Sequence, residues 1–393
     1  MSARARTAAL AALTLCAAAC RATEPGPAWT ERGGWRTHVV HAGDVRLSGV
    51  AAGDLDPRTP GDEVLAVGER GALVLARVVD GVFRSEVIDE TGGELLQVAI
   101  GELDRAASGS EAVAVGVLTG AEEDGGEGVA WLLTPTAAGF ERTELYRAAA
   151  LLHAVVIAEL DPRGAGQEVA LAGFTREVVV LSRGAAGFTP RVVATLPGNA
   201  KGMAATRRGL AVACDDGSLV VVERPRADED PTGPWRVAYT WRGAAPLARV
   251  AARGDEVLFC DNGGVLRLLQ FAAGGGFERA LVCATAPDRL RGAVFADVDP
   301  RAPGTEAATG GYDGAVHAYR LTPQAVPDDV VPASAGFQHY RVEAEPCGAD
   351  TGRVHHLAHG RFSGLGGASE PVTALVSAGH SGRVLAFDRL ASR

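Results

Sequence analysis

The segment Gly53–Glu63, which reads GDLDPRTPGDE, is the best guide to the fold because it recurs along the chain in recognisable copies. Each copy has an acid, a second acid two residues later, and then a glycine and a closing glutamate at an unchanged spacing. The four copies are Asp54–Glu63, Glu102–Glu111, Glu159–Glu168 and Asp297–Glu306. Self-similarity of this kind is the mark of a repeat architecture, in which one supersecondary unit is used several times.

The same order of strands surrounds the loops. A strand of small residues (A) precedes the loop, a second strand (B) follows it, a tight turn such as Asp215–Gly217 leads to a third (C), and an aromatic residue opens a fourth (D). A four-stranded unit that returns every roughly 45–60 residues is typical of a propeller blade. We therefore predict an all-β protein, a seven-bladed β-propeller of four-stranded antiparallel blades. The D-strand aromatics are Trp35, Phe83, Phe140, Phe188, Trp235, Phe277 and Phe337.

The two ends of the repeat predict how the ring closes. Trp35–Val40 reads as a D strand with no A, B or C strand before it. Residues 353–388 supply A, B and C strands with no D strand after them. The N-terminal strand would therefore complete the last blade, and closure would remove the exposed edges of an open sheet. The predicted propeller domain spans residues 35–393.

A longer stretch from residue 53, GDLDPRTPGDEVLAVGERGALVLARVVDGVF, resembles FG-GAP or VCBS-type propeller repeats, and the resemblance extends over residues 35–388. It implies a propeller fold and says little about activity, because one fold serves many functions. In calcium-binding members of that family the loop supplies alternate oxygen ligands to the ion. Asp54 and Asp56 match the first two of those ligands.

Arg58 occupies the next ligand position of this loop, where a guanidinium would repel a cation. We therefore favour a structural loop in which Arg58 pairs with Asp56 or Glu63, and we predict no metal ion and no other cofactor. Calcium binding stays open as the alternative. Its best candidates lie in the second loop, where an alanine stands in place of the arginine, and they are Glu102, Asp104 and Glu111.

Residues 1–19 have the pattern of a signal peptide, with two arginines followed by a short apolar run. Small residues precede Cys20, which favours a bacterial lipoprotein lipidated at Cys20, with simple secretion as the alternative. Residues 20–34 contain several prolines and glycines and are predicted to form a flexible tether. The protein would then be exported to the periplasm or the cell surface, and only the lipid would touch the membrane.

The net charge of −10 argues against nucleic-acid binding, which requires a basic surface. Four cysteines fall in the predicted propeller, at positions 214, 260, 283 and 347, and none has the CxxC spacing of a zinc site. Cys214 and Cys260 stand where other blades have glycine at the end of strand B. They are interpreted as small buried residues.

Aligning the A strands places different residues at the mouth of the central channel, where propellers commonly bind ligands. An acidic protein with a cationic mouth would concentrate an anionic ligand there. The alternative is that these side chains are solvated strand ends without a ligand. The entry positions are Ser48, Leu96, His153, Lys201, Arg291 and His355, with Gln97 and His356 one residue on, Arg249 near the same level, and Tyr312 and His380 in B–C turns.

Two functions fit these residues. The favoured one is a non-catalytic, monomeric binding or scaffold propeller whose partner is an anionic small molecule, a glycan or a protein. The alternative is a lyase or hydrolase that acts on acidic saccharides through the histidines and cations of the mouth. A hydrogen bond from His355 or His356 to a carboxylate would favour the enzyme. A metal ion held by His355 and His380 is a further alternative, although the sequence fixes no carboxylate partner for them.

Overall fold

The structure, a computed structural model, describes residues 29–393 apart from short gaps. The gaps are residues 91, 106–108, 119–125, 137–138, 162–165, 226–232, 272–276, 300–305, 325–338 and 391–393. The predicted signal peptide and the predicted lipidation site, Cys20, lie outside the described residues. So does Phe337, which was predicted to open a D strand.

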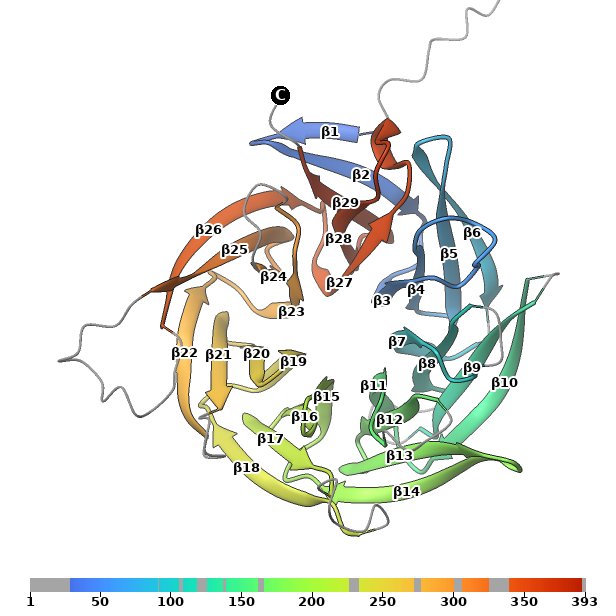
Figure 1. Cartoon of the computed structure of the whole chain (residues 1–393), viewed down its shortest axis with the longest axis vertical. Coiled ribbons are helices and arrows are strands. Elements are labelled where there is room, and N and C mark those ends of the chain that lie inside the picture. The colour runs from blue at the N-terminus through green and yellow to red at the C-terminus, as the bar shows by residue number, and fades with distance from the viewer. Residues whose placement is uncertain are drawn as a thin grey trace, which may run out of the picture.

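Seven antiparallel sheets stand around a common axis like the blades of a propeller (Figure 1). This arrangement confirms the predicted all-β, seven-bladed propeller. The chain runs through each of the first six blades from an inner strand A to an outer strand D. One short 3-10 helix, η2 (Leu365–Gly367), accompanies the strands in the part of the chain that the structure describes. Within that part, no helix has the length and apolarity needed to span a membrane.

Each of the first six blades is built from four consecutive strands. Blade 1 consists of β3 (Leu47–Gly53), β4 (Glu63–Gly68), β5 (Ala72–Val79) and β6 (Val82–Glu90). Blade 2 consists of β7 (Glu94–Gly101), β8 (Glu111–Val117), β9 (Gly128–Thr136) and β10 (Gly139–Ala148). Blade 3 consists of β11 (Leu152–Ala158), β12 (Glu168–Gly173), β13 (Glu177–Gly184) and β14 (Gly187–Thr195).

The next three blades repeat this order. Blade 4 consists of β15 (Ala200–Thr206), β16 (Gly209–Cys214), β17 (Ser218–Glu223) and β18 (Arg236–Arg242). Blade 5 consists of β19 (Leu247–Arg253), β20 (Glu256–Asp261), β21 (Val265–Phe271) and β22 (Phe277–Thr285). Blade 6 consists of β23 (Leu290–Ala296), β24 (Glu306–Gly311), β25 (Ala315–Gln324) and β26 (His339–Ala349).

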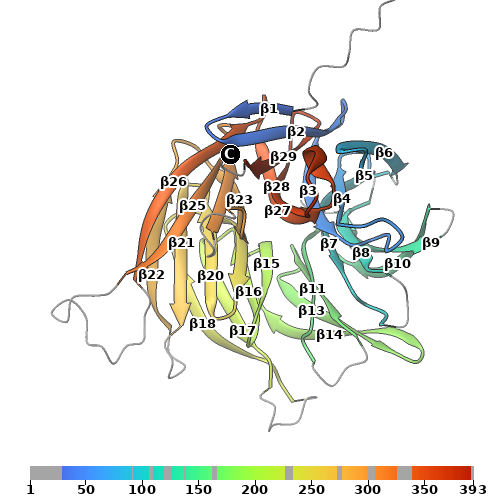
Figure 2. The ribbon, with the colours of Figure 1, turned by 45° about the horizontal axis from the view of Figure 1, so that its top comes forward.

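Blade 7 joins the two ends of the chain, as predicted. Its A, B and C strands come from the C-terminal part, and β2 (Trp35–Ala42) pairs with the C strand as strand D (Figure 2). The register places Thr37 opposite Phe387 and Val39 opposite Leu385. The C-terminal strands are β27 (Val354–Phe362), β28 (Val372–Gly379) and β29 (Arg383–Arg389).

A further strand, β1 (Trp29–Arg32), pairs with β2 as the outermost strand of this sheet. It falls in the segment for which a flexible tether was predicted. Gly33 and Gly34, which suggested a linker, are the two central residues of the β1–β2 hairpin, with φ of 59° and 78°. Two consecutive positive φ angles match the twist of paired strands, so this glycine pair makes a tight turn rather than a linker.

The core is divided among the seven blade interfaces. Seven clusters of buried side chains are found in the described part of the chain, and each takes residues from two neighbouring blades. Between blades 1 and 2, for example, Leu65 and Val67 of β4 pack with Leu95 and Val98 of β7. Each blade is therefore stabilised by its two neighbours, and the ring leaves no blade face uncovered.

Candidate functional site

Strand A of every blade contains a register shift near its N-terminal end. In blade 1, Leu47 pairs with Gly68 and Gly49 pairs with Val67, so that Ser48 is the extra residue. A β-bulge of this kind changes the direction of a side chain without disturbing the rest of the strand. The seven bulges thus create a ring of positions around the axis at which the residue type can differ from blade to blade. They are Ser48, Leu96, His153, Lys201, Ala248, Arg291 and His355.

Six of these seven bulge residues are the entry positions expected from the sequence. In blade 5, however, Ala248 occupies the bulge and Arg249 is one residue further on, at the level of Gln97 and His356. The same shift affects strand B of this blade. Asp261, and not Cys260, is the counterpart of the strand-B glycines, so the expected equivalence of Cys260 with Cys214 is wrong by one residue.

Close backbone contact explains the strand-B glycines. A Cβ at Gly68 would lie 2.0 Å from the carbonyl oxygen of Arg46, and one at Gly116 would lie 1.9 Å from that of Glu94. Blade 4 has Cys214 at this place and blade 5 has Asp261. Cys214 and Cys260 are both buried free thiols. Burial raises the pKa of the Cys214 thiol to about 11 and that of Cys260 to about 12, which makes both thiols inert.

Arg249 is the most deeply buried cation at the axis, with 2% of its surface exposed. Its Nη1 donates to the carbonyl oxygens of Lys201 and Ala248, at 2.6 and 3.0 Å. Its Nε and Nη2 have no hydrogen-bond partner. Burial, followed by the charge of Arg291, lowers the pKa of Arg249 to about 10, so the guanidinium is still charged at neutral pH.

Arg291, in the neighbouring blade, adds a second guanidinium with an unsatisfied donor. Its Nε is buried without a hydrogen-bond partner, and its guanidinium carbon lies 5.1 Å from the centre of the Tyr312 ring. Among the residues that the structure describes, neither Arg249 nor Arg291 forms an ion pair with a carboxylate. Two adjacent positive charges are therefore held inside the protein without a counter-charge.

Three histidines surround these arginines and are neutral at pH 7. His153 is 7% exposed, and its Nδ1 has no partner. Burial, and next the charge of Arg249, lowers the pKa of His153 and of His355 well below the usual value. The same two causes bring the pKa of His356 to about 3. His355 Nδ1 donates to the Ser48 carbonyl at 3.0 Å, so the two histidines of β27 bond to backbone atoms of blade 1.

The candidate residues form two groups at the mouth face, defined as the face that carries the D–A connections and the B–C turns. In the first, the Lys201 ammonium lies 4.2 Å from the centre of the Phe174 ring, and His153 stacks on the same ring. Phe174 was missed by the sequence analysis. Its signal is its place directly after the strand-B glycine, which is also the place of Tyr312 and His380.

In the second group, His355 and His380 stack with their ring centres 4.9 Å apart, and Tyr312 lies 6.1 Å from His380. Arg353 joins Arg291 over the Tyr312 ring, at 4.6 Å. Arg249 connects the two groups, because its charge lowers the pKa of His153 in the first group and of His355 in the second. The structure thus brings the predicted residues His153, Lys201, Arg291, Tyr312, His355, His356 and His380 to one end of the axis.

The four acidic loops lie on the opposite face, the loop face, and their closing glutamates bond to the backbone. Glu63 Oε2 accepts the amides of Leu55 and Asp56, at 2.9 and 3.1 Å. Glu111, Glu168 and Glu306 make the equivalent bond to their own loops. As predicted, Arg58 pairs with Asp56, through two bonds of 2.7 and 2.9 Å; it does not pair with Glu63.

The weak calcium candidates are engaged with other partners. Glu111 accepts the Leu103 amide at 2.9 Å, and Asp104 pairs with Arg183 at 2.8 Å. Glu102 is exposed, and its amide donates to Gln167 at 2.7 Å. Within the described ranges, no three His, Cys, Asp or Glu side chains are grouped as metal ligands.

Comparison with known proteins supports the fold and no finer assignment. No family model matches the chain, and no curated protein matches it. A solved structure with the same fold is the WD40 β-propeller domain of Doa1, with a TM-score of 0.57 and 12% sequence identity over 89% of this chain and 95% of that one. At this identity the likeness shows a shared propeller architecture.

Proposed function

We propose that this protein is a non-catalytic binding propeller that holds an anionic ligand at the mouth end of its axis. The observation that carries the proposal is Arg249, a buried guanidinium whose Nε and Nη2 have no partner. Burying a charge is costly unless it is paired and hydrogen-bonded. Here the cost is increased because the neighbouring charge is Arg291, another cation.

A bound anion would offset this cost in two ways. It would supply acceptors to the unpaired donors of Arg249 and Arg291, and it would supply the missing negative charge. Charge-assisted hydrogen bonds to a guanidinium are among the strongest in proteins, and the planar fork of arginine fits two oxygens of one carboxylate, sulfate or phosphate. An oxyanion of this class is therefore the proposed ligand group.

The arrangement around the axis is one-sided, which suits a single asymmetric ligand. Blades 3 to 7 contribute His153, Lys201, Arg249, Arg291 and His355, whereas blades 1 and 2 contribute Ser48 and Leu96 at the bulge. The aromatic rings of Phe174 and Tyr312 stand beside the cations. The anionic group of a larger ligand would bind on the cationic side, and the rest of the ligand would face the neutral blades.

The histidine contacts favour binding over catalysis. A mouth histidine polarised by a carboxylate would support acid–base chemistry. In the described residues, His355 and His356 instead bond to the backbone of Ser48 and Val50. Their neutral state is fixed by burial and by nearby cations, which weakens both of them as bases.

The proposal also includes the cellular location of the protein and its family. The N-terminal pattern supports export, with lipid anchoring at Cys20, and a monomeric propeller then presents the mouth face to soluble ligands or to a partner protein. Kinship with FG-GAP or VCBS-type repeats rests on the four acidic loops.

Calorimetric titration with sulfate, phosphate and citrate tests the proposed function. Lys201→Ala and Arg291→Ala should each weaken binding about tenfold, the value of one charge-assisted bond. Arg46→Ala is the matched control, since Arg46 lies on the same face but is exposed and pairs with Glu69. Binding should also weaken as salt is raised. Equal affinities in all three variants would contradict the proposal.

A further inference from the structure

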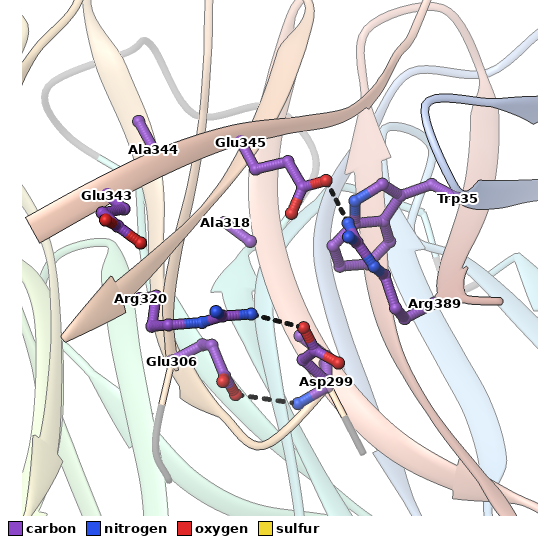
Figure 3. A pocket seen from close by; sticks show the side chains of 10 residues that line it. Trp35, Asp299, Glu306, Ala318, Arg320, Glu343, Ala344, Glu345 and Arg389 are labelled. Carbon is purple, nitrogen blue, oxygen red and sulfur yellow. Dashed lines mark hydrogen bonds and ion pairs between the residues drawn. The ribbon is translucent and has the colours of Figure 1, made fainter. Parts of the chain in front are cut away.

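A second candidate site lies on the loop face, between blades 6 and 7 (Figure 3). It is a cavity of about 550 Å³, a volume within the range of small-molecule sites. Blade 6 contributes Asp299, Glu306, Arg320 and Glu345, and the closing blade contributes Trp35 and Arg389. The cavity is separate from the axial cluster, because no bulge residue of strand A lines it.

Two buried donors on the blade 7 side have no partner. Trp35 is 2% exposed, and its Nε1 makes no hydrogen bond. Arg389 lies with its guanidinium carbon 5.3 Å from the centre of the Trp35 ring. Its Nη1 is held by Glu345, and its Nε is buried without a partner. Both side chains line the cavity and so could donate to a molecule inside it.

The blade 6 side offers acceptors. Asp299 and Glu306 are each 4% exposed, and both carboxylates accept hydrogen bonds inside the protein. Asp299 Oδ2 accepts from Arg320 Nη2 at 2.6 Å, and Glu306 Oε2 accepts the Val298 amide at 3.2 Å. Figure 3 shows both bonds on one wall of the cavity, opposite Arg389 and Trp35.

The lining excludes two simple classes of ligand. Four carboxylates against two guanidiniums would repel an anion, and each guanidinium already holds one of those carboxylates. A metal cation offers no hydrogen-bond acceptor, so it would leave the donors Trp35 Nε1 and Arg389 Nε without a partner. A hydroxyl group both donates and accepts, and therefore satisfies both walls at once.

We infer that this cavity binds an uncharged, hydroxyl-rich molecule, a sugar or a polyol. Its hydroxyl oxygens accept from Trp35 Nε1 and Arg389 Nε, and its hydroxyl hydrogens bond to the carboxylates of blade 6. Trp35 is the first residue of β2 and Arg389 is the last residue of β29, so the ligand touches both strands that close the ring. Binding should therefore stabilise the closing sheet against opening.

Ligand-observed NMR with glucose, galactose, mannose and glycerol at millimolar concentrations tests this inference. At least one of these probes should bind the full-length protein, and hydrogen exchange of the β2 amides should slow in its presence. Ala344→Trp should reduce the affinity about tenfold or more by filling the cavity, because Ala344 is an exposed lining residue whose change spares the core.

Two matched variants distinguish binding in this cavity from binding at the axial cluster and from a general effect of added bulk. Thr143→Trp places the same bulk on an exposed outer strand of blade 2 and should bind the sugar like the native protein. Arg249→Met removes the axial cation and should also keep sugar binding while losing anion binding. The inference is overturned if no probe binds, if Ala344→Trp binds like the native protein, or if Ala344→Trp loses sulfate binding instead.

Discussion

His38 and Asp388 meet inside blade 7, where His38 Nε2 lies 2.7 Å from Asp388 Oδ1 although 350 residues separate them in sequence. Asp388 is fully buried, and Arg36 donates to its other oxygen at 2.5 Å. Burial raises the pKa of Asp388, but the hydrogen bonds from His38 and Arg36 outweigh it and the net pKa is lowered. The ring is thus closed by a buried ionic cluster as well as by strand pairing.

Asp388→Ala should therefore lower stability by about 3–5 kcal/mol, because it leaves Arg36 and His38 without their acid in the interior. Chemical denaturation measures this loss. Asp89→Ala is the matched control, since the Asp89–Arg142 pair is exposed, and its loss should cost about 0–1 kcal/mol. Equal losses in the two variants would show that closure does not depend on the buried cluster.

Stability should fall as the pH is lowered below about 6.5. Burial lowers the pKa of His153, His355 and His356 in the folded state, so at these three positions the unfolded chain takes up protons in this range and the folded protein does not. Each histidine then removes up to about 1.4 kcal/mol per pH unit. Denaturation curves between about pH 7 and pH 5 should show this slope. His356→Gln should reduce it, and a native protein equally stable across the range would contradict the burial of neutral histidines.

Calcium should leave the melting temperature unchanged. Arg58 neutralises Asp56, and Glu63 and Glu111 are committed to backbone amides. Melting curves in excess calcium and in chelator should then coincide. A bound ion well above its dissociation constant would stabilise the fold by a few kcal/mol, and such a rise would show that the acidic loops are metal sites.

The fold could be predicted from the sequence because the same sequence pattern recurs from blade to blade. The loop acids, the small A strands and the D-strand aromatics recur, and the unpaired first strand matches the incomplete last blade. Register in blade 5 could not be counted in this way. There the hairpin between Arg253 and Glu256 replaces the acidic loop, which leaves no fixed point from which to number Arg249 or Cys260.

The chemistry of the candidate site could not be predicted in the same way, because it depends on strand pairing and packing, which a single sequence does not show. The β-bulge is a feature of strand pairing, and it alone makes the seven inner positions equivalent. The lack of partners for Nε and Nη2 of Arg249 follows from packing between blades 4, 5 and 6. In the same way, the glycine pair before Trp35 has the composition of a linker, and its role as a hairpin turn depends on β1 finding β2.

The stability of the Arg249→Met variant with and without sulfate shows whether Arg249 binds an anion. Without an anion the variant should be at least as stable as the native protein, because methionine removes an unpaired buried charge. Added sulfate should then stabilise the native protein more than the variant, since the general salting effect of sulfate is common to both. A variant that is less stable without anion and responds equally to sulfate would contradict the proposed anion site, because Arg249 would then be a structural residue and not an anion-binding one.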